Sequence, residues 1–428
     1  MKRIAFYTLG CKLNFSETSA LAQQFADAAY QIVEFAEVAD IYVINTCTVT
    51  SAAEKKGRQI IQRAVHKNPK ARIAVIGCFA ELRPEEIRAL DGVDYVLGTQ
   101  NKHLLLECIE NNGEIADHGK TISPVFVGSY SNIGRTRSFF KIQDGCDNFC
   151  SYCAIPYARG RSCSDTVENT GSVAEKIASQ GVKEIVLTGV NIGDFGRKNG
   201  ENFYQLLRKL VLIDGVERYR ISSIEPDLLT DEIIDLVAEN GKIMPHFHIP
   251  LQAGNDEVLE KMKRRYRCDL FRDRVDRIKK VMPDAFVAAD IIAGFPTETK
   301  SQFEDACRFV ESLPLSALHV FSYSPRPEAL SWNFKSVYPM EEKKERSRQL
   351  HCISDRKKSE FYKSFIGEHS PVLWEADTSE GYMFGYTPNY LKVKIPQNKQ
   401  WVNTVEMVRL EQLKKDGDKD WVFEGFRL

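Results

Sequence analysis

The sequence predicts an α/β fold in three parts: an N-terminal open parallel α/β domain (residues 1–130), a central partial (β/α)6 barrel (131–365) and a small C-terminal antiparallel β-barrel (366–428). In the first two parts, short apolar runs alternate with helix-like stretches, as in parallel β/α units. In the last part, short strands separated by turns replace this alternation. A chain of 428 residues is long enough for two to four domains with buried cores.

The N-terminal domain is predicted from short apolar runs at residues 4–9, 41–46 and 73–76. Helix-like stretches such as 17–29 separate them, which favours parallel strands joined by helices. A further run at 95–98 is expected to complete this sheet.

A cysteine follows each of the first three runs: Cys11, Cys47 and Cys78. The carboxyl ends of parallel strands share one edge of a sheet, so we expect these three cysteines to meet there. Any one of them alone is better interpreted as a small buried hydrophobe, as is Cys108 in its apolar helical segment. Three at the same topological place favour a three-thiolate iron–sulfur cluster.

The central part again alternates strands and helices. Six β/α units suit an open, partial barrel whose functional edge lies at the carboxyl ends of the strands. We predict its strands at residues 139–142, 184–188, 218–221, 246–249, 286–291 and 317–321.

The most informative motif, Cys146-x-x-x-Cys150-x-x-Cys153, follows the first of these central strands. Thiolates this close in a loop can converge on one soft metal centre, and three ligands on a four-iron cluster leave one iron open for chemistry. The alternative is a structural zinc site. Cys163 lies ten residues further on and could complete it, although no fourth cysteine or histidine follows at finger or ribbon spacing.

Polar or glycine-bearing turns follow the later central strands. Glycine lets a backbone approach a ligand, while Glu225 and Gln252 could hydrogen-bond the ribose hydroxyls or the amino acid moiety of a nucleoside cofactor. Each turn alone is a weak signal, and Glu225 could simply be solvated, but together they predict a binding wall. The candidate cofactor contacts at these turns are Gly189, Asn191, Ser223, Glu225, Gln252 and Phe295.

Other potential ligands are given structural interpretations. His246 and His248 alternate along one strand and should point to the same face, where packing or a hydrogen bond is favoured over metal ligation. Four further cysteines have no partner at a ligand spacing and are expected not to bind metal: Cys163, Cys268, Cys307 and Cys352.

Composition indicates a globular protein with reduced thiols. Eleven cysteines, an odd number without a signal-like start, favour metal ligation over a disulfide framework. No apolar run approaches the length of a membrane span, so we expect a cytoplasmic protein without a membrane partner. The net charge is −1. Basic runs at 54–72 and 261–280 are each most often solvated surface, but two of them modestly favour a polyanionic partner.

The C-terminal module is rich in aromatic residues, which can stack on unpaired bases when exposed, although most are expected in its core. From residue 367 to the end, eight Lys or Arg stand against ten Asp or Glu. RNA binding there would depend on shape, aromatic rings and a local basic patch such as Lys392 and Lys394.

Taken together, these features resemble the methylthiotransferases, radical S-adenosylmethionine enzymes that insert a methylthio group at an unactivated carbon. The resemblance covers nearly the whole chain, and the C-terminal module is similar to a TRAM domain, an RNA-binding barrel. The motifs that carry it are Leu9-Gly10-Cys11, Asn45-Thr46-Cys47, Gly77-Cys78, the run 145–160, and His248-Ile249-Pro250-Leu251-Gln252.

The resemblance implies two [4Fe-4S] clusters and S-adenosyl-L-methionine as cofactors. The cluster on Cys146, Cys150 and Cys153 would bind S-adenosylmethionine through its open iron and reduce it to a 5′-deoxyadenosyl radical, with Tyr152 as the aromatic residue before the last cysteine. The cluster on Cys11, Cys47 and Cys78 would carry the sulfur. These six cysteines are therefore the expected metal ligands and catalytic residues.

Within the family, the stretch 385–390 looks most like the branch acting on C2 of N6-threonylcarbamoyladenosine next to the tRNA anticodon. The implied partners are the tRNA anticodon stem-loop, a flavodoxin-like or ferredoxin-like electron donor, and a sulfur donor that the sequence does not identify. Ala253 and Thr297 depart from the serine and glycine common at these positions, which leaves the nearby cofactor contacts open.

Two alternatives stay open from the sequence. The same chemistry could act on isopentenyl-modified adenosine of tRNA or on an aspartate of a ribosomal protein. A non-catalytic, redox-sensing iron–sulfur protein that binds nucleic acid is the alternative of another class.

Overall fold

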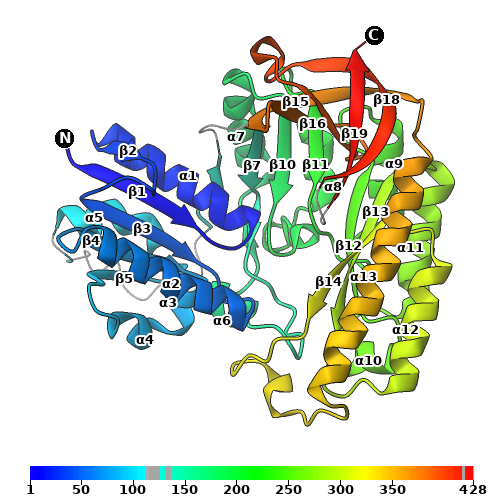
Figure 1. Cartoon of the computed structure of the whole chain (residues 1–428), viewed down its shortest axis with the longest axis horizontal. Helices are drawn as coiled ribbons and strands as arrows, with labels where there is room; N and C mark the ends of the chain where they lie inside the picture. The colour runs from blue at the N-terminus through cyan, green and yellow to red at the C-terminus, as the bar shows by residue number, and fades with distance from the viewer. Residues whose placement is uncertain (112, 114–125, 132–135, 417–419, 428) are drawn as a thin grey trace.

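The computed structural model describes residues 1–111, 113, 126–131, 136–416 and 420–427. The N-terminal sheet with its helices lies to one side of the central strands, and the C-terminal strands lie across one end of them (Figure 1). Over these residues, no helix is both long and apolar enough to cross a bilayer.

The N-terminal part is a five-stranded parallel sheet with strand order β2-β1-β3-β4-β5. The four predicted runs are confirmed as strands. The sequence did not predict the short edge strand β2, because three residues are too few to show a strand pattern. The strands are β1 (Arg3–Thr8), β2 (Gln31–Val33), β3 (Ile41–Thr46), β4 (Arg72–Gly77) and β5 (Tyr95–Leu97).

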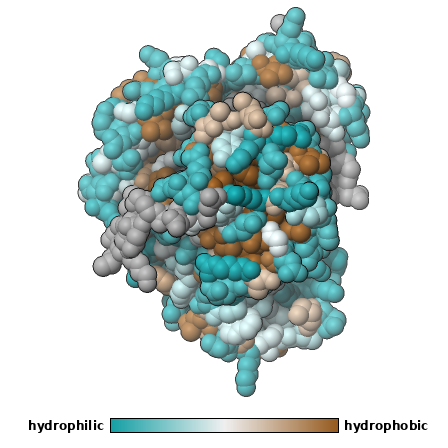
Figure 2. Space-filling model, turned by 90° about the vertical axis from the view of Figure 1, so that its left-hand side faces the viewer, coloured by the Kyte–Doolittle hydropathy of each residue, from teal (hydrophilic) through white to brown (hydrophobic). Residues whose placement is uncertain are grey.

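Helices cover both faces of this sheet, so the central strand β3 is buried along its whole length. One face packs against α1 (Lys12–Asp27) and α5 (Leu105–Glu110). The other packs against α2 (Ser51–Lys67), α3 (Cys78–Leu82) and α4 (Pro84–Arg88). The outer surface seen from this side of the molecule is mostly hydrophilic, with scattered hydrophobic patches (Figure 2).

The central part carries six parallel strands in sequence order, which confirms the predicted β/α alternation. They form two sheets, β11-β10-β7-β6 and β12-β13-β14, and the parallel bridges Tyr219 to Ile243 and Ser223 to His248 connect the two. The strand β6 (Ser129–Tyr130) pairs antiparallel with β7. The six parallel strands are β7 (Arg137–Lys141), β10 (Glu184–Thr188), β11 (Arg218–Ile221), β12 (His246–Gln252), β13 (Phe286–Ala293) and β14 (Ala317–Ser322).

Helices follow these strands and bury one large apolar core against them. Thr166, Thr230 and Thr299 cap three of the helices by accepting a hydrogen bond from the backbone N–H three residues on, so each helix starts directly after its loop. The helices are α6 (Ile155–Arg159), α7 (Val167–Ser179), α8 (Phe203–Leu210), α9 (Asp231–Glu239), α10 (Asp256–Lys261), α11 (Cys268–Val281), α12 (Lys300–Ser312) and α13 (Met340–Lys363).

Short elements lie in all three parts of the chain. The two-residue strands β8 (Gln143–Asp144) and β9 (Cys163–Ser164) pair antiparallel at the base of the Cys146 loop. The 3-10 turns are η1 (Lys102–Leu104), η2 (Ile192–Asp194), η3 (Arg197–Asn199), η4 (Leu330–Asn333) and η5 (Lys399–Trp401).

The C-terminal strands form an antiparallel sheet that closes in the order β15-β16-β17-β19-β18. One pair differs from the predicted all-antiparallel arrangement: β17 and β19 run parallel, because β18 carries the chain across before β19 returns. Trp374 is fully buried at the centre of this module. The strands are β15 (His369–Ser379), β16 (Tyr382–Tyr386), β17 (Lys392–Pro396), β18 (Val405–Asp416) and β19 (Asp420–Arg427).

Arginines at the amino ends of the central strands hold the C-terminal module. Arg218 donates to the Tyr386 carbonyl at 2.8 Å and the Pro371 carbonyl at 2.9 Å, and Arg137 donates to Glu375 at 2.8 Å. The neighbouring Arg220 donates to the Pro388 carbonyl at 3.0 Å. The module therefore covers the amino ends of these strands and leaves their carboxyl ends to the cysteine loops.

Candidate functional site

The Cys146, Cys150 and Cys153 loop leaves the carboxyl end of β7 through β8 and ends in α6. Cys150 is buried and the other two cysteines are half-buried. Gly145, at the start of the loop, has φ of +66° and lies so close to the Arg161 carbonyl that a Cβ would clash with it. Glycine at this position thus lets the start of the loop pack against the backbone at its end, where the Cys146 N–H donates to the Gly160 carbonyl at 3.0 Å.

The sulfurs of this loop accept hydrogen bonds from nearby donors. The backbone N–H of Asn148 lies 3.3 Å from Cys146 Sγ, and that of Ile155 lies 3.4 Å from Cys153 Sγ. Burial, with a smaller contribution from the Cys150 sulfur, raises the pKa of Cys146 and of Cys153 to about 12. Such groups become thiolates when a metal replaces their protons, and hydrogen bonds to sulfur then stabilise the charge.

The second triad lies at the carboxyl edge of the N-terminal sheet, where Cys11 follows β1, Cys47 follows β3 and Cys78 begins α3. Gly10 has φ of +105°, and a Cβ there would lie 2.9 Å from that of Cys47, which shows how closely the first two loops approach. Burial raises the pKa of Cys47 to about 11, and the sulfurs of Cys78 and Cys11 add to the effect. The structure thus brings these three cysteines together.

Each triad offers three free cysteine sulfurs. Cysteine thiolates are the ligands that hold iron–sulfur clusters, so the donor set of each triad fits such a cluster.

Arg264 joins the Cys146 loop to Glu225 of the predicted binding wall, a contact that the sequence did not predict. It donates to Cys150 Sγ at 3.1 Å and to Tyr152 Oη at 3.4 Å, and it forms an ion pair with Glu225. Burial raises the pKa of Glu225 to about 7, although Arg264 opposes this. The only signal in the sequence was the basic run 261–280, in which Arg264 does not stand out.

A cavity of about 200 Å³ lies beside Cys153. Tyr152 and Gln252 line it, together with Asp290 and Tyr323. Gln252 ends β12 at a register shift and has φ of +66°, an uncommon conformation for a residue other than glycine. Two of the predicted cofactor contacts therefore face a cavity next to the cysteine loop.

The other predicted contacts lie around it in different settings. Gly189 follows β10, where a Cβ would clash with Ile192 and Gln143, and the backbone N–H of Asn191 donates to Gln143 Oε1 at 2.8 Å. Ser223 bridges to β12. Phe295 is fully buried and packs edge-to-face on Tyr323, so it supports a wall of the cavity from the core.

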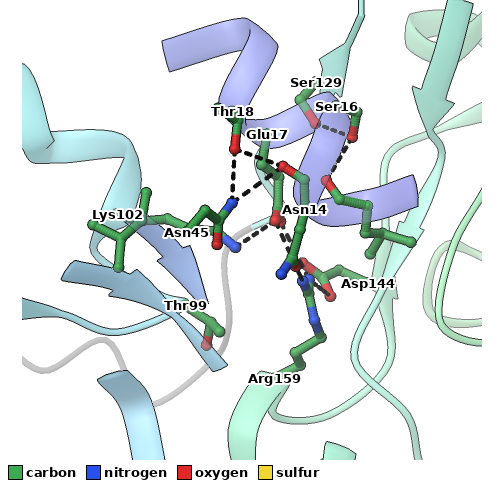
Figure 3. Close-up of polar contacts among 12 residues, drawn as sticks. Asn14, Ser16, Glu17, Thr18, Asn45, Thr99, Lys102, Ser129, Asp144 and Arg159 are labelled. Carbon is green, nitrogen blue, oxygen red and sulfur yellow. Dashed lines mark hydrogen bonds and ion pairs between the residues drawn. The ribbon is translucent and has the colours of Figure 1, made fainter. Parts of the chain in front are cut away.

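We define Glu17, Lys102, Lys141, Asp144 and Arg159 as a buried charge cluster, and Figure 3 shows Glu17, Lys102, Asp144 and Arg159 of this cluster. Glu17 Oε1 lies 2.9 Å from Lys141 Nζ and 3.2 Å from Arg159 Nη1, and Glu17 Oε2 lies 2.5 Å from Lys102 Nζ. Burial alone would raise the pKa of Glu17, but these cations hold it well below its ordinary value. Glu17 is therefore a carboxylate at neutral pH.

Arg159 extends this cluster to both triads. Its Nη2 donates to Asn14 Oδ1 at 2.6 Å, and its Nη1 donates to Asp144 Oδ1 at 2.9 Å. Asn14 in turn donates to the carbonyls of Leu9, which follows β1, and of Thr46, which ends β3. Burial raises the pKa of Cys78, and the Arg159 guanidinium opposes that rise. One arginine thus connects the strand ends of the N-terminal sheet with the stem of the Cys146 loop.

A larger cavity of about 860 Å³ lies toward the amino ends of β12, β13 and β14, because the first residue of each of these strands lines it. Its lining joins all three parts of the chain, because it includes Lys12 of α1, His248 of β12, Lys358 of α13 and Lys392 of β17. Tyr386 and Tyr390 also line it, and their rings stack with centroids 4.6 Å apart. Cations beside flat aromatic rings are the features that bind unpaired nucleotides.

Two family descriptions match the chain. Residues 3–98 match the Uncharacterized protein family UPF0004, and residues 140–310 match the Radical SAM superfamily. The two matched segments carry the Cys11, Cys47, Cys78 triad and the Cys146, Cys150, Cys153 triad, respectively.

Named relatives match over nearly the full length. Threonylcarbamoyladenosine tRNA methylthiotransferase MtaB of Bacillus subtilis (strain 168) is 39% identical over 96% of this chain and 94% of its own. The protein of the same name from Aquifex aeolicus (strain VF5) is 36% identical over 87% and 92%. Among solved structures, the radical S-adenosylmethionine methyltransferase TsrM from Kitasatospora setae has a TM-score of 0.56 at 14% identity, over 75% of this chain and 73% of its own, which supports the fold. The chain belongs to the tRNA methylthiotransferase family of radical S-adenosylmethionine enzymes.

Proposed function

We propose that this protein adds a methylthio group to C2 of N6-threonylcarbamoyladenosine next to the anticodon of tRNA, with two [4Fe-4S] clusters and S-adenosylmethionine. One observation carries the proposal: two cysteine triads, each at the carboxyl edge of a parallel sheet, are tied to each other by Asn14, Arg159 and Asp144. An enzyme that transfers sulfur needs a second three-thiolate site close to the first one, and this second site would hold the sulfur.

Cys146, Cys150 and Cys153 would hold one cluster, and Cys11, Cys47 and Cys78 the other. Together with S-adenosylmethionine, these clusters would supply one-electron reduction, a methyl group and a site for sulfur. The neighbouring residues prepare the pocket. Arg264 donates to the sulfur of Cys150 and to the side chain of Glu225, so it fixes the position of that side chain in the predicted binding wall.

The smaller cavity is the proposed place of the nucleoside cofactor. Gln252 offers an amide and Tyr152 a ring at its wall, and both lie next to Cys153. Its lining is mostly apolar, because Ile292, Phe321 and Tyr323 contribute to it. An apolar lining with a few polar groups excludes water and orients a ligand, which a radical reaction requires.

The larger cavity is the proposed place of the anticodon loop. It lies between the N-terminal domain (1–130), the radical S-adenosylmethionine domain (131–365) and the TRAM-like module (366–428), divisions that are themselves part of the proposal. Lys12, Lys358 and Lys392 line it beside the stacked Tyr386 and Tyr390. The module would thus contribute to RNA binding through one basic, aromatic wall despite its acidic total charge.

The choice of nucleoside has two supports. The relatives described above are named for threonylcarbamoyladenosine, and Tyr386 and Tyr390, which bound the stretch that resembles this branch, line the larger cavity. The test is mass spectrometry of tRNA nucleosides from cells that lack the protein. Loss of the methylthio-threonylcarbamoyl nucleoside would support the proposal, and loss of the isopentenyl counterpart would overturn the choice of substrate.

Two measurements on purified protein test the assigned clusters. Cys150→Ala should abolish formation of 5′-deoxyadenosine from S-adenosylmethionine, whereas cleavage at the wild-type rate would contradict the role of that triad. Replacing Cys11, Cys47 and Cys78 together should remove half of the iron and sulfide, because each triad would hold one cluster. Cys163→Ser is the matched control, and its metal content should stay that of the wild type.

A further inference from the structure

Three side chains from adjacent central strands meet between the two cavities: His248 of β12, Asp290 of β13 and His319 of β14. Asp290 pairs with His319 of β14 on one side of its strand. On the other side it pairs with Pro250 of β12, which lies two residues after His248. Residues two apart on a strand share a face, so all three point to one side of this sheet. Parallel strands therefore hold the group rigidly.

The three ligand atoms form a closed triangle. His248 Nε2 lies 2.5 Å from Asp290 Oδ1, His319 Nδ1 lies 3.3 Å from the same oxygen, and the two ring nitrogens lie 3.1 Å apart. In the described part of the chain, this is the group of histidine, cysteine or carboxylate side chains whose ligand atoms all lie within 4.8 Å of one another. The two imidazole rings stand nearly perpendicular, at 84°.

Hydrogen bonding does not satisfy all three sides of this triangle. If both nitrogens carry a proton, two N–H donors face each other. If only His248 Nε2 is protonated, His319 Nδ1 and the carboxylate oxygen are two acceptors that face each other. If only His319 Nδ1 is protonated, His248 Nε2 and the carboxylate oxygen are the two acceptors that face each other. A cation at the centre is attracted to all three atoms when the rings are neutral.

We propose that His248, Asp290 and His319 bind a divalent transition-metal cation, in a site separate from both cysteine triads. Two imidazoles and one carboxylate form a recurrent protein site for zinc and for non-haem iron, and it leaves further coordination positions open. Asp290 lines the smaller cavity, whereas both histidines line the larger one. The His319 side chain is 45% exposed, so the site is open to an ion from solvent.

The substrate of the proposed function could bind the cation at its open coordination positions. This second part of the proposal rests on the proposed function. A threonine joined through its amino group to a carbamoyl group keeps its carboxylate and its hydroxyl, which are both oxygen ligands. An isopentenyl group offers neither. The cation would therefore favour the threonylcarbamoyl nucleoside over the isopentenyl one.

Zinc is a suitable probe, because its X-ray absorption edge is separate from that of cluster iron. Under anaerobic conditions, cluster-loaded protein should bind one Zn²⁺ per chain with nitrogen and oxygen ligands at about 2.0–2.1 Å rather than sulfur at about 2.3 Å. Loss of a residue that only hydrogen-bonds to a metal ligand typically lowers metal affinity by roughly 10–100-fold. His319→Ala and Asp290→Asn remove a ligand itself, so each should lower the zinc affinity by more than this. Calorimetric titration gives the affinities.

His351→Ala is the matched control, because His351 lines the same cavity but lies outside the triangle, and it should bind zinc like the wild type. Equal affinity in wild type and His319→Ala, or a sulfur shell around the zinc, would overturn the site. His319 is half-exposed on the edge strand β14 of its sheet, so its variant should fold; an unchanged circular dichroism spectrum and an unchanged iron content would confirm this.

The ligand step has its own test. Zinc should strengthen binding of an anticodon stem-loop that carries N6-threonylcarbamoyladenosine, and not of one that carries N6-isopentenyladenosine, and His319→Ala should remove the difference. Equal effects on both RNAs with zinc bound would refute the ligand step but not the metal site. A product found on isopentenyladenosine would instead contradict the proposed function, whatever the zinc affinity.

Discussion

Replacing Glu17 with Gln keeps the shape of the side chain but removes the charge that three buried cations share. The side chains of Glu17, Lys102, Lys141 and Arg159 are each at most 6% exposed. Asp144 still pairs with Lys141 and Arg159, so Lys102 is the cation left without a carboxylate in the described contacts. Breaking a buried ion pair by removing one partner costs about 3–5 kcal/mol. Total stabilities are only about 5–15 kcal/mol, so Glu17→Gln should be strongly destabilising.

Urea unfolding monitored by fluorescence measures this loss. The matched control is Glu168→Gln, whose pair with Lys209 is at the surface with side chains 75% and 32% exposed; it should change the free energy of unfolding by less than about 1 kcal/mol. In the double variant Glu17→Gln, Lys102→Met, no unpaired lysine remains, and most of the loss should be recovered. Equal effects of Glu17→Gln and Glu168→Gln would refute the reasoning.

Three further predictions concern the cysteine loop and the cofactor wall. Glu225 keeps its proton up to about pH 7 in the folded chain, whereas the unfolded chain releases it near pH 4.5. Raising the pH across this interval should therefore lower the unfolding free energy by roughly 3 kcal/mol, and pH-dependent urea titrations of Glu225→Gln should lack this slope. Arg264→Met removes the donor to Cys150 and leaves Glu225 buried without its cation; equilibrium dialysis should show S-adenosylmethionine binding weakened by about 10–100-fold. Gly145→Ala places a Cβ against the Arg161 carbonyl, so iron analysis should show the loss of one cluster.

Local pattern was sufficient to predict the parallel strands and the meeting of distant cysteines. The runs at 41–46 and 184–188 agree with β3 and β10 residue for residue, because every residue of both strands is buried and each strand has a continuous apolar centre. Parallel connections then place the carboxyl ends at one edge, so Cys11, Cys47 and Cys78 could be assigned to one place without knowing any distance. Their role as ligands stays a prediction.

The residues that sequence reasoning missed depend on pairs far apart in the chain. Arg159 and Glu17 are 142 positions apart, and each looks like an ordinary surface residue in its own segment. His319 lies on a strand that the sequence predicted, but its contact with Asp290 depends on the register between β13 and β14. Periodicity states which face a side chain occupies and does not state which neighbour it meets.

The buried charge cluster also explains how two separate sheets can keep their cysteine edges in a fixed relation. An apolar contact is not directional, so α1 could slide along the stem of the Cys146 loop at little cost. Arg159 donates in fixed directions to Asn14 on one side and to Asp144 on the other, and each displacement would break a bond inside the protein.

Glu17→Gln, Lys102→Met should regain stability but retain fewer of these directional contacts, because Arg159 loses Glu17. Its yield of methylthiolated nucleoside per S-adenosylmethionine cleaved should then fall below that of the wild type, measured by liquid chromatography of both products. An unchanged ratio would show that the cluster serves stability alone, and that packing between the two domains is sufficient to align the triads.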